Sequence, residues 1–90
     1  MLPTEYSLYQ NYPNPFNSTT KIKFGLPRKS FTSLIVYDLI GRVIKTLVNH
    51  EVEPGYYEVE FDASLLSSGI YFCRIQAGEI IQTKKMVLIR

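Results

Sequence analysis

Three sets of side chains in this 90-residue sequence could do chemistry: the only histidine, the only cysteine and one pair of glutamates. His50 stands between Asn49 and Glu51, which predicts a polar loop. A lone loop histidine is normally solvated, because metal and catalytic-triad chemistry both need partner residues. We therefore expect neither a metal ion nor a catalytic role at His50.

Cys73 alternates with Tyr71 and Ile75. In a strand these three side chains share one face, and an apolar face is expected to point into the core. A buried cysteine behaves as a small hydrophobic residue and is inert. Because Cys73 is the only cysteine, an intrachain disulfide is excluded.

Glu58 and Glu60 lie two apart in an alternating run, which places their carboxylates roughly 7 Å apart in a strand. Such a pair could act as the acid and base of a glycosidase, but this needs a cleft and a raised pKa on one member. An outward strand face offers neither. The sequence also lacks a phosphate-binding glycine loop and a nucleophile elbow. We predict no enzyme activity and no cofactor.

Length and charge indicate one small domain over residues 1–90, with Met1 interpreted as an added start residue. The net charge of +2 is too weak, and its basic residues too spread out, to indicate nucleic-acid binding. No stretch is apolar enough to span a membrane, and the N-terminus lacks the basic-then-apolar pattern of a signal peptide. If this is the tail of a longer protein, the export signal is expected at that protein's far end.

The elements that must position these residues are short β-type runs punctuated by Gly, Pro, Asn and Asp. Two prolines predict an ordered loop at residues 11–17. Seven runs at regular spacing indicate an all-β, two-sheet sandwich. The predicted strands cover residues 5–10, 20–26, 32–38, 42–48, 56–62, 70–76 and 79–90.

Two local patterns refine this fold. Asp38 can cap a turn that Gly41 closes with a positive φ. Tyr71, two residues before Cys73 and after a corner at residues 63–69, resembles the tyrosine corner of Greek-key sandwiches. The seven strands and this corner predict an immunoglobulin-like (fibronectin III-like), seven-stranded antiparallel sandwich with Greek-key topology.

The immunoglobulin-like layout makes a register prediction. Its second and fifth strands are neighbours, so Lys21 and Lys23 should face Glu58 and Glu60 across the sheet. A structure that placed these charges far apart would contradict the strand order.

The last run contains Met86, Val87, Leu88 and Ile89, four apolar residues in succession. An edge strand of a two-layer sandwich has one core face, so two of these side chains should face outward. Two interpretations are open. In the first, a bulge or another part of the domain covers them. In the second, they form a recognition strand with the neighbouring basic residues, and this edge strand can add to a partner's sheet.

Four motifs in order resemble the type IX secretion system (Por secretion system) C-terminal sorting domain, type A. The first is Tyr-Pro-Asn-Pro-Phe-Asn at residues 12–17, continuing through Thr20, Ile22, Phe24 and Leu26-Pro27. The others lie at residues 36–43, 66–72 and 83–88. Ser18 and Cys73 depart from the family's common residues, without touching the terminal segment.

The resemblance implies a non-catalytic domain that directs a larger secreted protein of the Bacteroidetes or related phyla. Its implied partners are an outer-membrane type IX translocon, a sortase-like peptidase and an N-terminal cargo domain of the same polypeptide. The implied route passes through the periplasm and ends in release or attachment at the cell surface. No nucleic acid and no transmembrane segment are implied.

The resemblance also assigns roles to residues of this sequence. The segment read by the translocon is expected to be Lys84, Lys85, Met86, Val87, Leu88, Ile89 and Arg90. Motif residues expected to be structural are Tyr12, Pro13, Asn14, Pro15, Phe16, Asp38, Gly41, Arg42, Gly69 and Tyr71.

An alternative function is a non-catalytic structural or carbohydrate-binding accessory module of a secreted enzyme. Such a module needs an exposed aromatic platform, for which Tyr9, Tyr12 and Tyr56 are the candidates.

Overall fold

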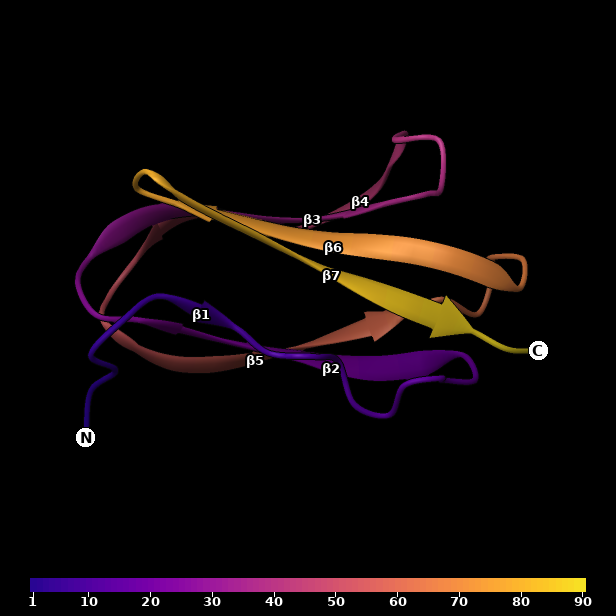
Figure 1. Ribbon diagram of the computed structural model, residues 1–90, viewed down its shortest axis with the longest axis horizontal. Helices are drawn as coiled ribbons and strands as arrows, with labels where there is room; N and C mark the ends of the chain where they lie inside the picture. Colours follow the sequence, from indigo (N-terminus) through magenta and orange to yellow (C-terminus); the bar gives the residue numbers. More distant parts are fainter.

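The computed structural model describes residues 1–90 as seven strands with no helix (Figure 1). No helix is therefore available that could cross a membrane. The strands are β1 (Ser7–Leu8), β2 (Thr19–Leu26), β3 (Ser30–Tyr37), β4 (Val43–Val52), β5 (Gly55–Asp62), β6 (Gly69–Ala77) and β7 (Ile80–Leu88).

The strands form two packed sheets, which confirms the predicted immunoglobulin-like sandwich. One sheet has three strands in the order β1-β2-β5, and the other has four in the order β4-β3-β6-β7. All strand pairs are antiparallel, and the chain crosses between sheets after β2, β4 and β5. Figure 1 shows the two layers and places the chain termini at opposite ends of the long axis.

The register prediction is confirmed. β2 pairs with β5, with Lys21 opposite Glu60 and Lys23 opposite Glu58. The closest charges lie on the diagonal, where Lys21 Nζ is 3.9 Å from Glu58 Oε1. Because both side chains of this pair are more than half exposed, it stabilises the fold by only a fraction of a kcal/mol.

The core lies between the sheets and draws one large side chain from a loop. Phe16, between β1 and β2, is buried and packs against Phe61 of β5 with ring centroids 6.3 Å apart. Cys73 is buried as predicted, and burial raises the pKa of its thiol to about 12. Other fully buried side chains are Ile22, Phe24, Leu26, Leu34, Val36, Met86 and Leu88.

Two predicted boundaries were wrong by several residues. The predicted loop at His50 is part of β4, because pairing with β3 continues to Val52, whose side chain is buried; His50 itself is exposed. The first strand shrinks to Ser7–Leu8, because beyond Leu8 only single contacts with β2 remain, at Tyr9 and Tyr12, and Gln10 between them bonds to β7. The remaining boundaries shift by at most two residues.

Candidate functional site

The terminal strand β7 is an edge strand whose side chains alternate between two environments. Met86 and Leu88 are 0 % and 1 % exposed and belong to the core. Val87 is half-buried on the outer face, and Ile89, just past the strand, is 52 % exposed. The prediction that two of the four apolar side chains face outward is therefore confirmed.

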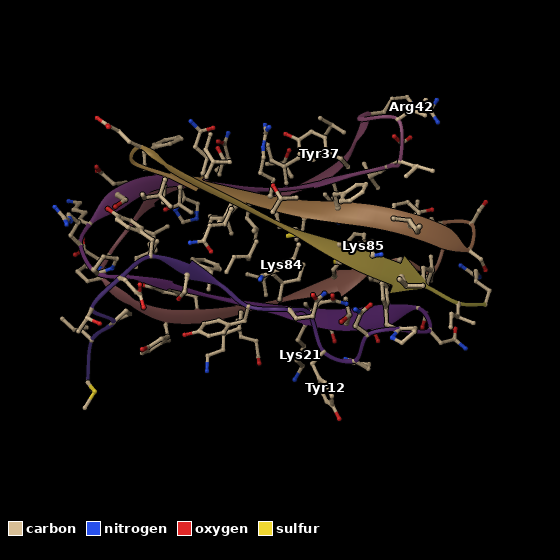
Figure 2. The ribbon with its side chains drawn as sticks, viewed as in Figure 1. Tyr12, Lys21, Tyr37, Arg42, Lys84 and Lys85 are labelled. Carbon is tan, nitrogen blue, oxygen red and sulfur yellow. The ribbon has the colours of Figure 1, made fainter.

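The two lysines that precede them are divided in the same way. Lys84 pairs with the buried Cys73 and lies half-buried on the inner side, whereas Lys85 pairs with Phe72 and is exposed on the outer side. Figure 2 labels both and shows their positions on the strand. The outer side chains of the terminal segment are thus Lys85, Val87 and Ile89.

Loop residues 10–16, which we call the covering loop, occupy the backbone edge of this segment. The N–H of Val87 donates to Asn14 Oδ1 at 2.9 Å, and its C=O accepts from the N–H of Phe16 at 2.9 Å. The N–H of Ile89 donates to the C=O of Phe16 at 2.9 Å. Gln10 Nε2 donates to the C=O of Lys85 at 2.7 Å.

The covering loop is itself held against β2. Asn11 is buried, and its Nδ2 donates to the C=O of Pro13 at 3.1 Å and to Thr20 Oγ1 at 3.0 Å. The hydroxyl of Thr20 donates to the same carbonyl at 2.8 Å. The backbones of Tyr12 and Lys21 exchange two hydrogen bonds, each 3.0 Å long. The peptide bonds preceding Pro13 and Pro15 are both cis.

The end of the chain is also held by the corner between β5 and β6. The N–H of Arg90 donates to Ser68 Oγ at 3.0 Å, and its Nη1 donates to the carbonyls of Ala63 and Leu66 at 3.2 and 2.5 Å. The hydroxyl of Tyr71 donates to the carbonyl of Ser67 at 2.6 Å, which confirms the predicted tyrosine corner. Gly69, the first residue of β6, pairs with Leu88.

The turn between β3 and β4 lies at the same end of the sandwich, and its geometry matches the prediction. Asp38 Oδ1 accepts from the N–H groups of Arg42 and Ile40 at 2.9 and 3.1 Å, and Arg42 Nε donates to Asp38 Oδ2 at 2.7 Å. The hydrogen bond from the Arg42 N–H is the main cause that lowers the pKa of Asp38. Gly41 closes the turn at a φ of +88°, which favours glycine.

A sequence model of the secretion system C-terminal sorting domain matches residues 10–89, nearly the whole chain. The chain belongs to this family. It carries a C-terminal sorting signal for type IX secretion, which is the signal of a secreted or cell-surface protein. The search of curated proteins found no match.

A hollow of about 490 Å³ in this sorting domain lies between the Asp38–Arg42 turn and the corner. Its only ionisable side chains besides Tyr71 are Asp38 and Arg42. General acid catalysis at neutral pH needs a carboxyl group with a raised pKa, whereas the pKa of Asp38 is lowered. No three His, Cys, Asp or Glu side chains come together in a metal-binding group.

The three tyrosines predicted as a possible aromatic platform, Tyr9, Tyr12 and Tyr56, do not form one open surface. Lys23 Nζ lies over the ring of Tyr9 at 5.4 Å and over the ring of Tyr56 at 5.3 Å, so one ring face of each is in contact with a cation of the same domain. Tyr12 projects separately into solvent and is 81 % exposed (Figure 2).

Sequence reasoning missed what the covering loop contacts. It assigned structural roles to Asn14 and Phe16, but not the hydrogen bonds that join them to β7 some 70 residues later. No periodicity signals such a contact. It also missed Gln82 of β7, whose side chain accepts from the N–H of Leu8 at 2.9 Å and donates to the C=O of Tyr6 at 3.2 Å.

Proposed function

We propose that this domain directs an N-terminal cargo domain through an outer-membrane type IX translocon, and that the translocon reads Lys85, Val87 and Ile89. These are the outward side chains of the terminal segment Lys84–Arg90. The remaining members of that segment have other contacts: Met86 and Leu88 fill the core, and Arg90 bonds to the corner. Lys84 lies on the inner side.

This proposal rests on one observation: in the terminal segment the backbone of Val87 is already hydrogen-bonded, whereas the outward side chains are free to contact a partner. Addition of a partner strand requires unpaired N–H and C=O groups at the edge. At Val87 both of these groups already bond to the covering loop, whereas the side chains of Lys85 and Ile89 are exposed. Recognition through side chains therefore fits the folded domain, and strand addition at Val87 does not.

The arrangement of the termini supports the same proposal. The cargo would precede Leu2, at the end of the sandwich opposite to Arg90 (Figure 1). A folded cargo would thus leave the terminal segment accessible. On the proposed route the protein crosses the periplasm and then the translocon. A sortase-like peptidase next removes this domain, and the cargo is released or attached to the cell surface.

We also propose that the domain has no catalytic activity of its own. The ionisable groups that the sequence offered for chemistry do not meet in a cleft. Glu58 and Glu60 are exposed opposite lysines, His50 is exposed, and the Cys73 thiol is buried with a raised pKa. The family to which the chain belongs is defined by sorting.

The test is export of a reporter fused to residues 2–90 in a host that has the secretion system. Deletion of Lys84–Arg90 would remove Met86 and Leu88 from the core, so it would not separate recognition from folding. The variant Lys85→Glu/Val87→Ser/Ile89→Ser changes only the outward set. We expect its secreted fraction to fall about tenfold or more, which corresponds to ~1.4 kcal/mol of recognition.

The matched control is Ile81→Ser, which removes an exposed apolar side chain from the other half of β7. It should be secreted like the unchanged fusion. Equal secretion of the triple variant and the control, with both domains folded by circular dichroism, would contradict the proposal.

A further inference from the structure

We propose that the outer face of the four-stranded sheet docks an acidic protein surface of the export machinery. This inference rests on the proposed function, and it extends the recognition site from the terminal strand to two rows of side chains that cross the sheet. By "outer face" we mean the side-chain set Ile35, Tyr37, Val43, Phe72, Arg74 and Lys85.

The strand register joins these side chains into two rows. Val43 is paired with Tyr37, Tyr37 with Phe72, and Phe72 with Lys85, so the first row crosses all four strands. Residues paired in this way share a face of the sheet. In the adjacent row Ile35 is paired with Arg74.

The outer face is apolar but not buried. Val43 is 58 % exposed, and Ile35, Tyr37 and Phe72 are partly exposed although no other strand covers them. The β3–β4 turn borders this face and leaves a hollow of about 290 Å³ beside it. An exposed face on which apolar side chains adjoin across several strands is typical of a contact surface rather than of scattered single residues.

The charged side chains of the outer face indicate which kind of partner binds there. The Arg74 guanidinium lies 4.9 Å from the centre of the Tyr37 ring and donates to the Tyr37 hydroxyl at 2.7 Å. Neither Arg74 nor Lys85 takes part in any of the four ion pairs of the domain. The two rows contain no carboxylate, and Asp38, which lines the adjoining hollow, is already paired with Arg42. The occupant should therefore supply the carboxylates and neutralise these two cations.

A protein fits this face better than a glycan. Sugars are bound by stacking on open aromatic faces, but the Tyr37 ring already carries Arg74 on one side. Ile35 and Val43 instead offer aliphatic contacts, which match an apolar protein surface with acidic residues around it. Lys85 belongs both to this face and to the terminal segment, so one partner surface can contact both.

The test uses the same reporter fusion with charge changes at Arg74. We expect Arg74→Glu to reduce the secreted fraction about tenfold or more, because it sets like charges against each other, and Arg74→Lys to retain most of it. The control is Arg28→Glu, an identical charge reversal at an exposed arginine of the β2–β3 loop that takes part in no ion pair.

A second variant, Val43→Asp, tests the apolar row at an exposed edge position where folding is least affected. It should lower secretion while the melting temperature stays close to that of the unchanged domain. Wild-type secretion of folded Arg74→Glu and Val43→Asp would overturn the inference and leave the proposed function standing. Failure of the unchanged fusion to be secreted would overturn both.

Two binding measurements on the purified domain test other occupants. Sedimentation with phosphatidylglycerol vesicles, lost on Arg74→Glu, would assign the face to a lipid surface. A dimer in analytical ultracentrifugation, dissociated by Val43→Asp, would assign it to a second copy. Either result would overturn the inference, whereas a monomer that ignores the vesicles agrees with it.

Discussion

The two halves of β7 differ in what their outward backbone groups contact. In the first half, the N–H and C=O groups of Ile81 and Thr83 that point away from β6 have no backbone hydrogen-bond partner. In the second half, those of Val87 bond to the covering loop, and so does the N–H of Ile89 just past the strand. The half of β7 that the family resemblance assigns to recognition by the translocon is therefore the half whose backbone is held by the covering loop. A fixed backbone presents its side chains in one geometry, which lowers the entropy lost on binding.

Phe16→Ala should have the largest effect on stability, because it removes the residue that anchors the covering loop to the second half of β7. Phe16 is 2 % exposed, contacts Phe61 in the core and makes the two backbone bonds to Val87 and Ile89. Removing its ring should lower the free energy of unfolding by about 3–5 kcal/mol, as for other buried phenylalanines. Urea denaturation followed by circular dichroism measures this. A loss below about 1 kcal/mol would show that the loop is not anchored through the core.

Asn14→Ala should sharpen the comparison, because it removes one bond to the strand and leaves the core intact. We expect a loss of about 1 kcal/mol in stability and faster amide hydrogen exchange at Val87. In the unchanged domain the Val87 amide should exchange more slowly than that of Thr83. Asn17→Ala is the control, since Asn17 is exposed and its side chain makes no hydrogen bond to the protein. Equal exchange at Val87 in both variants would argue against the covering role.

Tyr71→Phe tests the corner to which Arg90 bonds. It removes the hydroxyl that donates to the carbonyl of Ser67 and keeps the buried ring. The expected loss of unfolding free energy is about 0.5–1.5 kcal/mol. Thermal melting measures the change, with Tyr12→Phe, at an exposed tyrosine, as the control. Similar melting temperatures for the two variants would mean that the corner bond adds nothing.

Acidification should have the smallest effect on the stability of the domain. It should weaken the end of the sandwich that carries the terminal segment. The pKa of Asp38 is lowered mainly by the Arg42 N–H, and that of Asp62 mainly by the Ser64 N–H. A carboxylate with a lowered folded-state pKa stabilises the protein above its ordinary pKa, near 3.8, and this stability is lost as the pH falls through the folded-state value. The melting temperature should therefore decrease below about pH 4, and by less in Asp38→Asn. A decrease as large in Asp38→Asn would exclude Asp38 as a contributor.

The sequence predicted those parts of the molecule that follow from local pattern. Alternation located the strands, and the layout they implied placed Lys21 and Lys23 opposite Glu58 and Glu60. Turn chemistry placed Asp38 correctly. Alternation also places Val87 and Leu88 on opposite faces of the sheet, because successive side chains of a strand point to opposite sides.

The contacts that close the sandwich could not be predicted in this way. Asn14 meets Val87, and Gln82 meets Leu8, through side chains that bond to backbone groups far away in the sequence. Such bonds have no period and depend on how the two sheets are placed. The outer face could not be recognised either, because its rows exist only once β3 is known to lie between β4 and β6.

The most direct test of side-chain recognition compares the secreted fractions of two reporter fusions. One carries Lys85→Glu/Val87→Ser/Ile89→Ser, which changes the outward side chains, and the other carries Asn14→Ala, which uncovers the N–H of Val87 and leaves its C=O bonded to Phe16. We predict that the first is retained in the cell and that the second is secreted like the unchanged fusion. Secretion of the triple variant, together with increased secretion of Asn14→Ala, would mean that the translocon reads the strand's edge and would contradict this account.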